Sequence, residues 1–111
     1  MKICVTSKGA GLDSGFEERF GRTPYFIFHD IDSKATESVE NPFAGESGGV
    51  GPRAAQLVID HQADVLITGQ MGDNASRAMK SSGKQVFSFK GDSPVSYVLE
   101  EYRAGKLKQL Q

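Results

Sequence analysis

Short runs of apolar and β-branched residues dominate the first forty positions of the chain. Residues 2–6 form a brief β-rich run that ends at a turn-forming segment. Residues 25–31 are rich in aromatic and β-branched side chains, and residues 35–40 alternate between polar and apolar ones. The segment Asp32-Ser33-Lys34 between them has the composition of a turn. The pattern therefore predicts three strands, of which the last two form a hairpin.

From residue 53 onwards, the apolar pattern alternates between a helical and an extended period. One face of residues 53–61 carries Ala54, Leu57 and Val58, a spacing typical of a helix. The predicted elements are, in order, a helix at 53–61, a strand at 64–68, a helix at 73–82, a strand at 85–89 and a helix at 94–104.

Serine, proline and glycine mark the expected ends of these helices. Ser93 is expected to cap the last helix, with Pro94 in its first turn. Gly83 and Gly105 follow the second and third helices. Glycine at such positions commonly takes the left-handed conformation that ends a helix.

The element order β-β-β-α-β-α-β-α limits the possible topologies. Crossovers through a helix are right-handed and join parallel strands, so the strand at 64–68 should lie parallel to the strand at 2–6. The hairpin should add antiparallel strands on the other side. We therefore predict one α/β domain over residues 1–111, with a mixed five-stranded sheet and about three helices.

Composition and charge exclude several classes of protein. The 111 residues carry 13 basic and 14 acidic side chains, giving a net charge of −1. A nucleic-acid-binding domain normally has a basic excess, so nucleic acid is not an expected partner. No apolar run approaches the ~20 residues of a membrane span. The single cysteine, Cys4, excludes an intrachain disulfide and fits a cytoplasmic protein. The oligomeric state stays open.

No catalytic motif is present in the sequence. The chain lacks a phosphate-binding GxxxxGK[ST] loop, a GxGxxG fingerprint, HExxH, CxxC and a GxSxG elbow. Its aspartates are scattered, which is typical of caps and turns rather than of a two-metal site. We therefore predict no catalytic residues and a protein that is not an enzyme.

Glycine-rich loops are the strongest functional signal. The segments 7–15, 69–72 and 90–93 follow predicted strands whose carboxyl ends should share one edge of the sheet. Open α/β sheets bind ligands outside those ends, and helix N-termini offer free N–H groups to anions. Glycine can also serve only to form tight turns. Basic residues near these loops favour an anionic ligand. They are Lys8, Arg19, Arg22, Arg53 and Lys90.

Four residues are candidate soft metal ligands. Cys4 lies inside a predicted strand, where a small buried hydrophobe is the simplest explanation. His29 is best explained as a histidine of the sheet, and His61 as a complement to the helix dipole. Met71 lies in a glycine-flanked loop at the predicted binding edge, where a ligand role and a core role are equally open.

The segment Glu18-Arg19-Phe20-Gly21-Arg22-Thr23-Pro24-Tyr25-Phe26 resembles the FGR-x-x-YF signature of the dinitrogenase iron–molybdenum cofactor biosynthesis (cofactor-carrier) family. Segments 67–75, 83–86 and 102–107 are similar to that family in the same order and spacing. The resemblance covers essentially the whole chain. It implies a ribonuclease H-like α/β fold with strand order 3-2-1-4-5.

The resemblance also implies a function. Members of this family bind or carry metal–sulfur clusters, such as iron–molybdenum cofactor precursors or, in the orange proteins, a non-covalently held molybdenum–copper sulfide cluster. This chain is accordingly expected to bind such a cluster without catalysis and to exchange it with donor or acceptor proteins. A cluster-free protein-interaction module and an enzyme acting on a phosphorylated substrate are the alternatives. The predicted cluster-binding residues are Lys8, Gly9, Arg19, Arg22, Gly49, Gly51, Gly69, Met71, Gly72 and Asn74.

Overall fold

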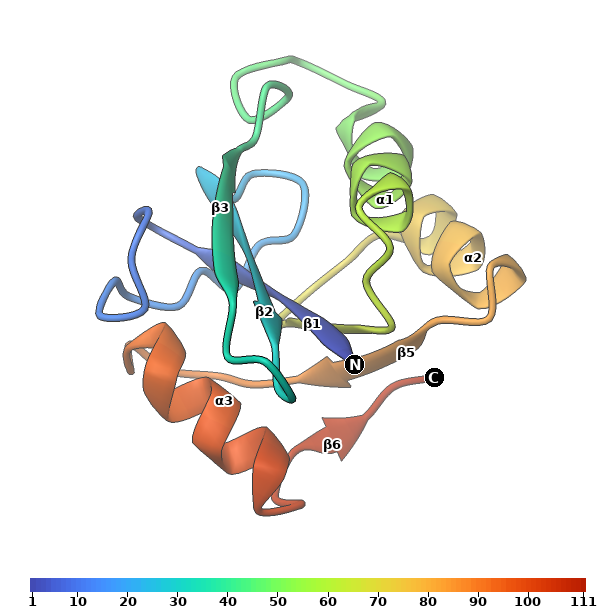
Figure 1. Cartoon of the computed structure of the whole chain (residues 1–111). Helices are drawn as coiled ribbons and strands as arrows, with labels where there is room; N and C mark the ends of the chain where they lie inside the picture. Colours follow the sequence, from blue (N-terminus) through green and yellow to red (C-terminus); the bar gives the residue numbers. More distant parts are fainter.

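The computed structural model describes residues 1–111 and arranges six strands and three helices in three layers (Figure 1). Helices α1 and α2 lie side by side on one face of the sheet, and α3 covers the other face. The strands are β1 (Lys2–Ser7), β2 (Tyr25–Asp30), β3 (Thr36–Glu40), β4 (Val65–Thr68), β5 (Gln85–Ser88) and β6 (Lys108–Gln109). The helices are α1 (Val50–Asp60), α2 (Asp73–Ser81) and α3 (Val95–Arg103).

The sheet has the order β3-β2-β1-β4-β5-β6. Strands β1, β4 and β5 are parallel, whereas the β2–β3 hairpin joins β1 in antiparallel fashion. Parallel pairing of β1 with β4 is thus confirmed. The prediction of five strands was wrong, because β6 pairs antiparallel with β5 through Lys108 and Gln109. Lys108 and Gln109 are both polar and too few to show the alternation of a strand. Their pairing with β5 depends on the direction in which the turn after α3 sends the chain.

Alternate residues of the central strands build a core on each face of the sheet. Cys4 and Leu66 pack with α1 and α2, whereas Ile3 and Ile67 pack with α3. This alternation follows from the strand period of two, which sends neighbouring side chains to opposite faces. Both faces of β1 and β4 are therefore buried, and the ends of these strands can support a binding site.

The observed helix ends correct two predictions. Helix α1 begins at Val50 rather than at residue 53, because Gly49 takes a left-handed conformation (φ 64°) that turns the chain into the helix early. Pro94, not Ser93, occupies the N-cap of α3, without a capping side chain. Gly83 and Gly105 both have positive φ just after their helices, as predicted. Helix α1, the longest, has 11 residues, and no helix combines the length and the hydropathy of a membrane span.

Candidate functional site

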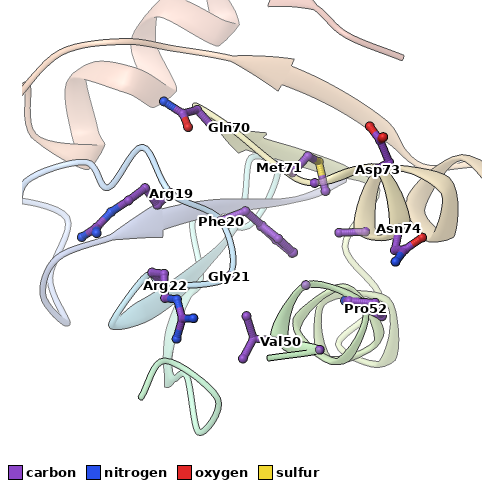
Figure 2. Close-up of a pocket in the computed structure, with 14 residues that line it drawn as sticks. Arg19, Phe20, Gly21, Arg22, Val50, Pro52, Gln70, Met71, Asp73 and Asn74 are labelled. Atoms are coloured by element: carbon purple, nitrogen blue, oxygen red, sulfur yellow. The ribbon is translucent and has the colours of Figure 1, made fainter. Parts of the chain in front are cut away.

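A cavity of about 550 Å³ opens at the edge of the sheet where β1 and β4 end (Figure 2). Four segments line it: the arginine loop (residues 17–24), the start of α1, the β4–α2 loop (residues 69–72) and the start of α2. These segments are distant in sequence and meet only because β1 and β4 are neighbours. The position agrees with the rule that open α/β sheets bind ligands at the carboxyl ends of their strands.

Two helix N-termini without side-chain caps meet at this cavity. Gly49 and Gly72 occupy the N-cap positions of α1 and α2, and neither helix has a capping side chain. Glycine at position 51 lets the helices approach, since a Cβ there would lie 3.3 Å from Cβ of Ala75. Because neither helix has a capping side chain, several backbone N–H groups lack an acceptor within the protein. They belong to Val50 and Gly51 of α1, and to Met71, Gly72, Asp73, Asn74 and Ala75 around the start of α2.

Free N–H groups at the start of a helix carry its positive partial charge. Serine, threonine, aspartate or asparagine at an N-cap would normally accept one of these hydrogen bonds. Glycine at both caps leaves the donors facing the cavity. The arrangement is chemically suited to an anion that contacts both helices.

Apolar side chains form the inner wall of the cavity. Figure 2 shows Phe20, Val50 and Met71 projecting into the space between the loops and the two helices. Phe20 is almost wholly buried and packs against Phe26, with ring centroids 5.7 Å apart. A ligand in this cavity would therefore meet polar N–H groups on one side and an apolar surface on the other.

The two arginines of the arginine loop are both exposed, but they have different partners. Nε of Arg19 lies 3.2 Å from Oε2 of Glu17. Burial opposes ionisation of Glu17, yet hydrogen bonds from the backbone and side chain of Arg19 hold its pKa below the ordinary value. Nη1 of Arg22 donates to the carbonyls of Ala44 and Glu46. Nε and Nη2 of Arg22 have no partner, so this guanidinium can still face an anion.

The backbone of Glu18 holds the β4–α2 loop in place. Its carbonyl accepts hydrogen bonds from the N–H groups of Gly69 (3.0 Å) and Gln70 (2.6 Å), and Phe20 N donates to Gln70 O. A Cβ at Gly69 would lie within 2.8 Å of the Glu18 backbone. Gly69, predicted as a cluster-binding residue, therefore provides close backbone packing and lies outside the cavity lining.

Lys8 and Gly9 also lie outside this cavity. Lys8 borders a second hollow of about 360 Å³, where its Nζ is 3.8 Å from Asp92. Gly9 exchanges hydrogen bonds with the hydroxyl of Ser7. The other predicted binding residues all line the main cavity. They are Arg19, Arg22, Gly49, Gly51, Met71, Gly72 and Asn74.

No side-chain cluster in the protein resembles a site for a bare metal ion. No three His, Cys, Asp or Glu side chains lie together in a way that could hold a metal ion. Cys4 is fully buried in β1, and burial raises the pKa of its thiol well above the usual value. His29 bonds Thr36, while His61 bonds the Leu57 carbonyl and stacks on Phe28. Met71 supplies the only sulfur in the cavity wall.

Several cavity residues were missed by the sequence reasoning. Gln70 and Asp73 flank residues that were predicted, and Phe20 and Gly21 belong to the FGR segment. The signal for Gly21 was its place between Arg19 and Arg22 in that segment. Its role depends on tertiary contact, because a Cβ there would lie 2.9 Å from Cγ2 of Val50.

Comparison with known proteins gives consistent matches over the whole chain. The sequence model of the family described as dinitrogenase iron-molybdenum cofactor matches residues 1–105. The apo form of the orange protein from Desulfovibrio gigas is 32% identical, with a TM-score of 0.92, over 97% of this chain and 91% of that one. A candidate NifB protein from Thermotoga is 31% identical, with a TM-score of 0.87, over 98% and 92%.

A more distant structure shares the fold alone. A candidate dinitrogenase from Methanocaldococcus jannaschii is 14% identical, with a TM-score of 0.71, over 100% of this chain and 95% of that one. No functionally curated protein matches the sequence significantly.

Proposed function

The chain belongs to the dinitrogenase iron–molybdenum cofactor family, and on that basis we propose that its cavity binds and carries an anionic metal–sulfur cluster. The observation that carries the proposal is the meeting of two helix N-termini without side-chain caps at one partly apolar cavity. The likeness to the orange protein from Desulfovibrio gigas supports it, because that chain aligns over nearly the whole length.

The residues present fit a pre-assembled cluster better than a bare metal ion. A sulfide-rich cluster brings its own metal ligands and needs N–H donors, positive charge and an apolar wall from the protein. The starts of α1 and α2 supply the donors, and Arg22 adds a guanidinium with free N–H groups. Phe20, Val50 and Met71 supply the wall.

The finer parts of the proposal concern the cargo and its handling. We propose a cluster of the molybdenum–copper sulfide or iron–molybdenum type, held without a covalent bond from the protein. Cys4 is the only thiol, and its raised pKa and complete burial disfavour a thiolate ligand. The protein then acts as a cytoplasmic carrier that exchanges the cluster with donor or acceptor proteins and catalyses no reaction.

Reconstitution tests this proposal directly. Apo-protein is incubated with tetrathiomolybdate and copper(I), desalted, and assayed by visible absorbance and metal analysis. Gly72→Val should abolish most uptake, because Gly72 lines the cavity and an added side chain there, with no protein atom within 4 Å of its Cβ, would take up space that is open to the ligand. Gly45→Val is the matched control, since Gly45 has equally open surroundings but lies outside the cavity.

Three outcomes decide the proposal. Wild type, Gly45→Val and Cys4→Ser should all retain the cluster, and uptake should fall as salt screens the anion at this open site. Equal loading of Gly72→Val, shown to be folded by its thermal transition, would contradict binding in this cavity. Loss of loading in Cys4→Ser alone would show instead that the thiol anchors the cluster.

A further inference from the structure

Two loops form one side of the cavity and are distant in the sequence. The arginine loop contributes Gly21 and Arg22 to the lining. The glycine-rich loop (residues 41–49) leads directly into Gly49, the N-cap of α1. The relative position of these loops therefore decides where the free N–H groups of Val50 and Gly51 lie.

The side chain of Asn41 joins these two loops at their base. It is 5% exposed, and its Nδ2 donates to the carbonyl of Gly21 (3.2 Å) and to that of Thr23 (2.9 Å). Its Oδ1 accepts a hydrogen bond from the N–H of Phe43 (3.0 Å). Both amide hydrogens and the amide oxygen are thus used, a set of partners that a carboxylate of the same shape cannot satisfy.

The contacts of Asn41 continue on both sides. Oγ1 of Thr23 lies within hydrogen-bond distance of the backbone N–H and carbonyl of Ser7, which ties the arginine loop to β1. Gly21 packs against α1, since a Cβ there would be 2.9 Å from Val50 Cγ2 and 3.6 Å from Gly51 N. A shift of the Gly21 carbonyl would therefore move the backbone that packs against the first two residues of α1.

We propose that Asn41 is a positioning residue for cluster binding, which holds the arginine loop against the start of α1 without touching the cargo. Asn41 does not line the cavity. Arg22 makes a second link between the same loops, through the carbonyls of Ala44 and Glu46, but it is exposed to solvent. Asn41 is the buried link. This role rests on the proposed function, because its consequence is measured as retention of the cluster.

The test is Asn41→Asp, which keeps the shape of the side chain and the acceptor for Phe43 but removes both donors. Residues that orient a binding group typically change affinity by about 10–100-fold when they are replaced. We expect the variant, loaded with tetrathiomolybdate and copper(I), to lose its cluster at least tenfold faster than wild type. In the cluster-free ¹H–¹⁵N spectrum, the amides of Val50 and Gly51 should shift.

A variant of lower stability at a remote position separates positioning from a general loss of stability. Val98→Ala removes buried volume from α3 on the opposite face of the sheet and should lower the melting temperature. It should retain the cluster like wild type. Equal cluster loss from Val98→Ala and Asn41→Asp at matched melting temperatures would overturn the proposal.

The remaining outcomes also decide it. If Asn41→Asp does not fold, Asn41→Ala removes the same donors without adding a charge and is judged by the same two measurements. Failure of wild-type protein to load would refute the proposed function. The positioning role is then judged by the cluster-free spectra, where unchanged Val50 and Gly51 amides would overturn it.

Discussion

Replacing Gly72 by aspartate should stabilise the protein and at the same time weaken its cluster binding. Gly72 is the N-cap of α2, with φ −71° and ψ 167°, a conformation that any residue adopts at this position. No protein atom lies within 4 Å of a Cβ built there. The new carboxylate can therefore accept a hydrogen bond from the free N–H groups of Asn74 or Ala75 without strain.

The stability gain is modest. Aspartate is better than glycine at an N-cap by a few tenths of a kcal/mol, and a negative charge at the helix start adds about 0.3–1 kcal/mol. A combined gain of roughly 0.5–1 kcal/mol should raise the melting temperature of the cluster-free protein by about 2–5 °C. Thermal unfolding followed by circular dichroism measures it.

The loss of binding should be larger and of opposite sign. A cavity of 550 Å³ is about 10 Å across, so an anion at its centre lies about 5 Å from a charge on the wall. With an effective dielectric constant of about 20–40, each unit of negative charge on the cluster is repelled by roughly 2–3 kcal/mol. Uptake should fall by at least thirtyfold, as measured by competition for tetrathiomolybdate and copper(I) during reconstitution.

Two matched variants separate charge from location. Ser96→Asp adds the same charge at an exposed position in the first turn of α3, on the opposite face of the sheet, and should load like wild type. Gly72→Ser supplies a capping oxygen without a charge and should give an intermediate loss. If Gly72→Asp has a raised melting temperature but takes up as much cluster as wild type, binding at the start of α2 is refuted. The new carboxylate would then cap the helix without affecting the cluster.

Three further predictions concern residues around the cavity. Gly69→Ala should destabilise the protein by about 1–3 kcal/mol in chemical denaturation, because its Cβ would lie within 2.8 Å of the Glu18 backbone; unchanged stability would show that the loop relaxes. Cys4→Ser should lower the free energy of unfolding by about 1–3 kcal/mol, because it buries a hydroxyl without a hydrogen-bond partner. In the wild type, burial raises the pKa of the Cys4 thiol and keeps it protonated, so it should react with iodoacetamide only after the protein unfolds. Arg22→Ala should release the cluster faster while the melting temperature stays within a few degrees; a large loss of stability with unchanged retention would assign Arg22 to loop attachment alone.

Most of the fold could be predicted because its determinants are local. The division of the β1 side chains between the two faces of the sheet and the apolar face of α2 follow directly from periods of 2 and 3.6. Parallel pairing of β1 with β4 follows from the handedness of crossovers. Strand β6 could not be predicted, because Lys108 and Gln109 pair through backbone groups that every residue carries.

The candidate site was predicted at the level of segments, but its individual residues were less predictable. The glycines of segment 69–72 indicated an anion-binding edge, and Gly72 does line the cavity, as does Gly49, another of the predicted binding residues. Gly69 looked equivalent in the sequence, but its N–H is bonded to the Glu18 carbonyl. Lys8 is also at the predicted edge, yet it faces the second hollow.

The pattern of residues along the chain thus predicted three helices, five of the six strands, the parallel pairing of β1 with β4 and the edge at which ligands can bind. These features depend on the period of apolar residues, on glycine at helix ends and on chain chirality, all of which are local. Which N–H groups stay free and which are used by other loops depends on contacts between segments that are distant in the sequence. The reason is physical: a backbone donor is available to a ligand only where no distant carbonyl reaches it, as Glu18 reaches Gly69 and none reaches Gly72.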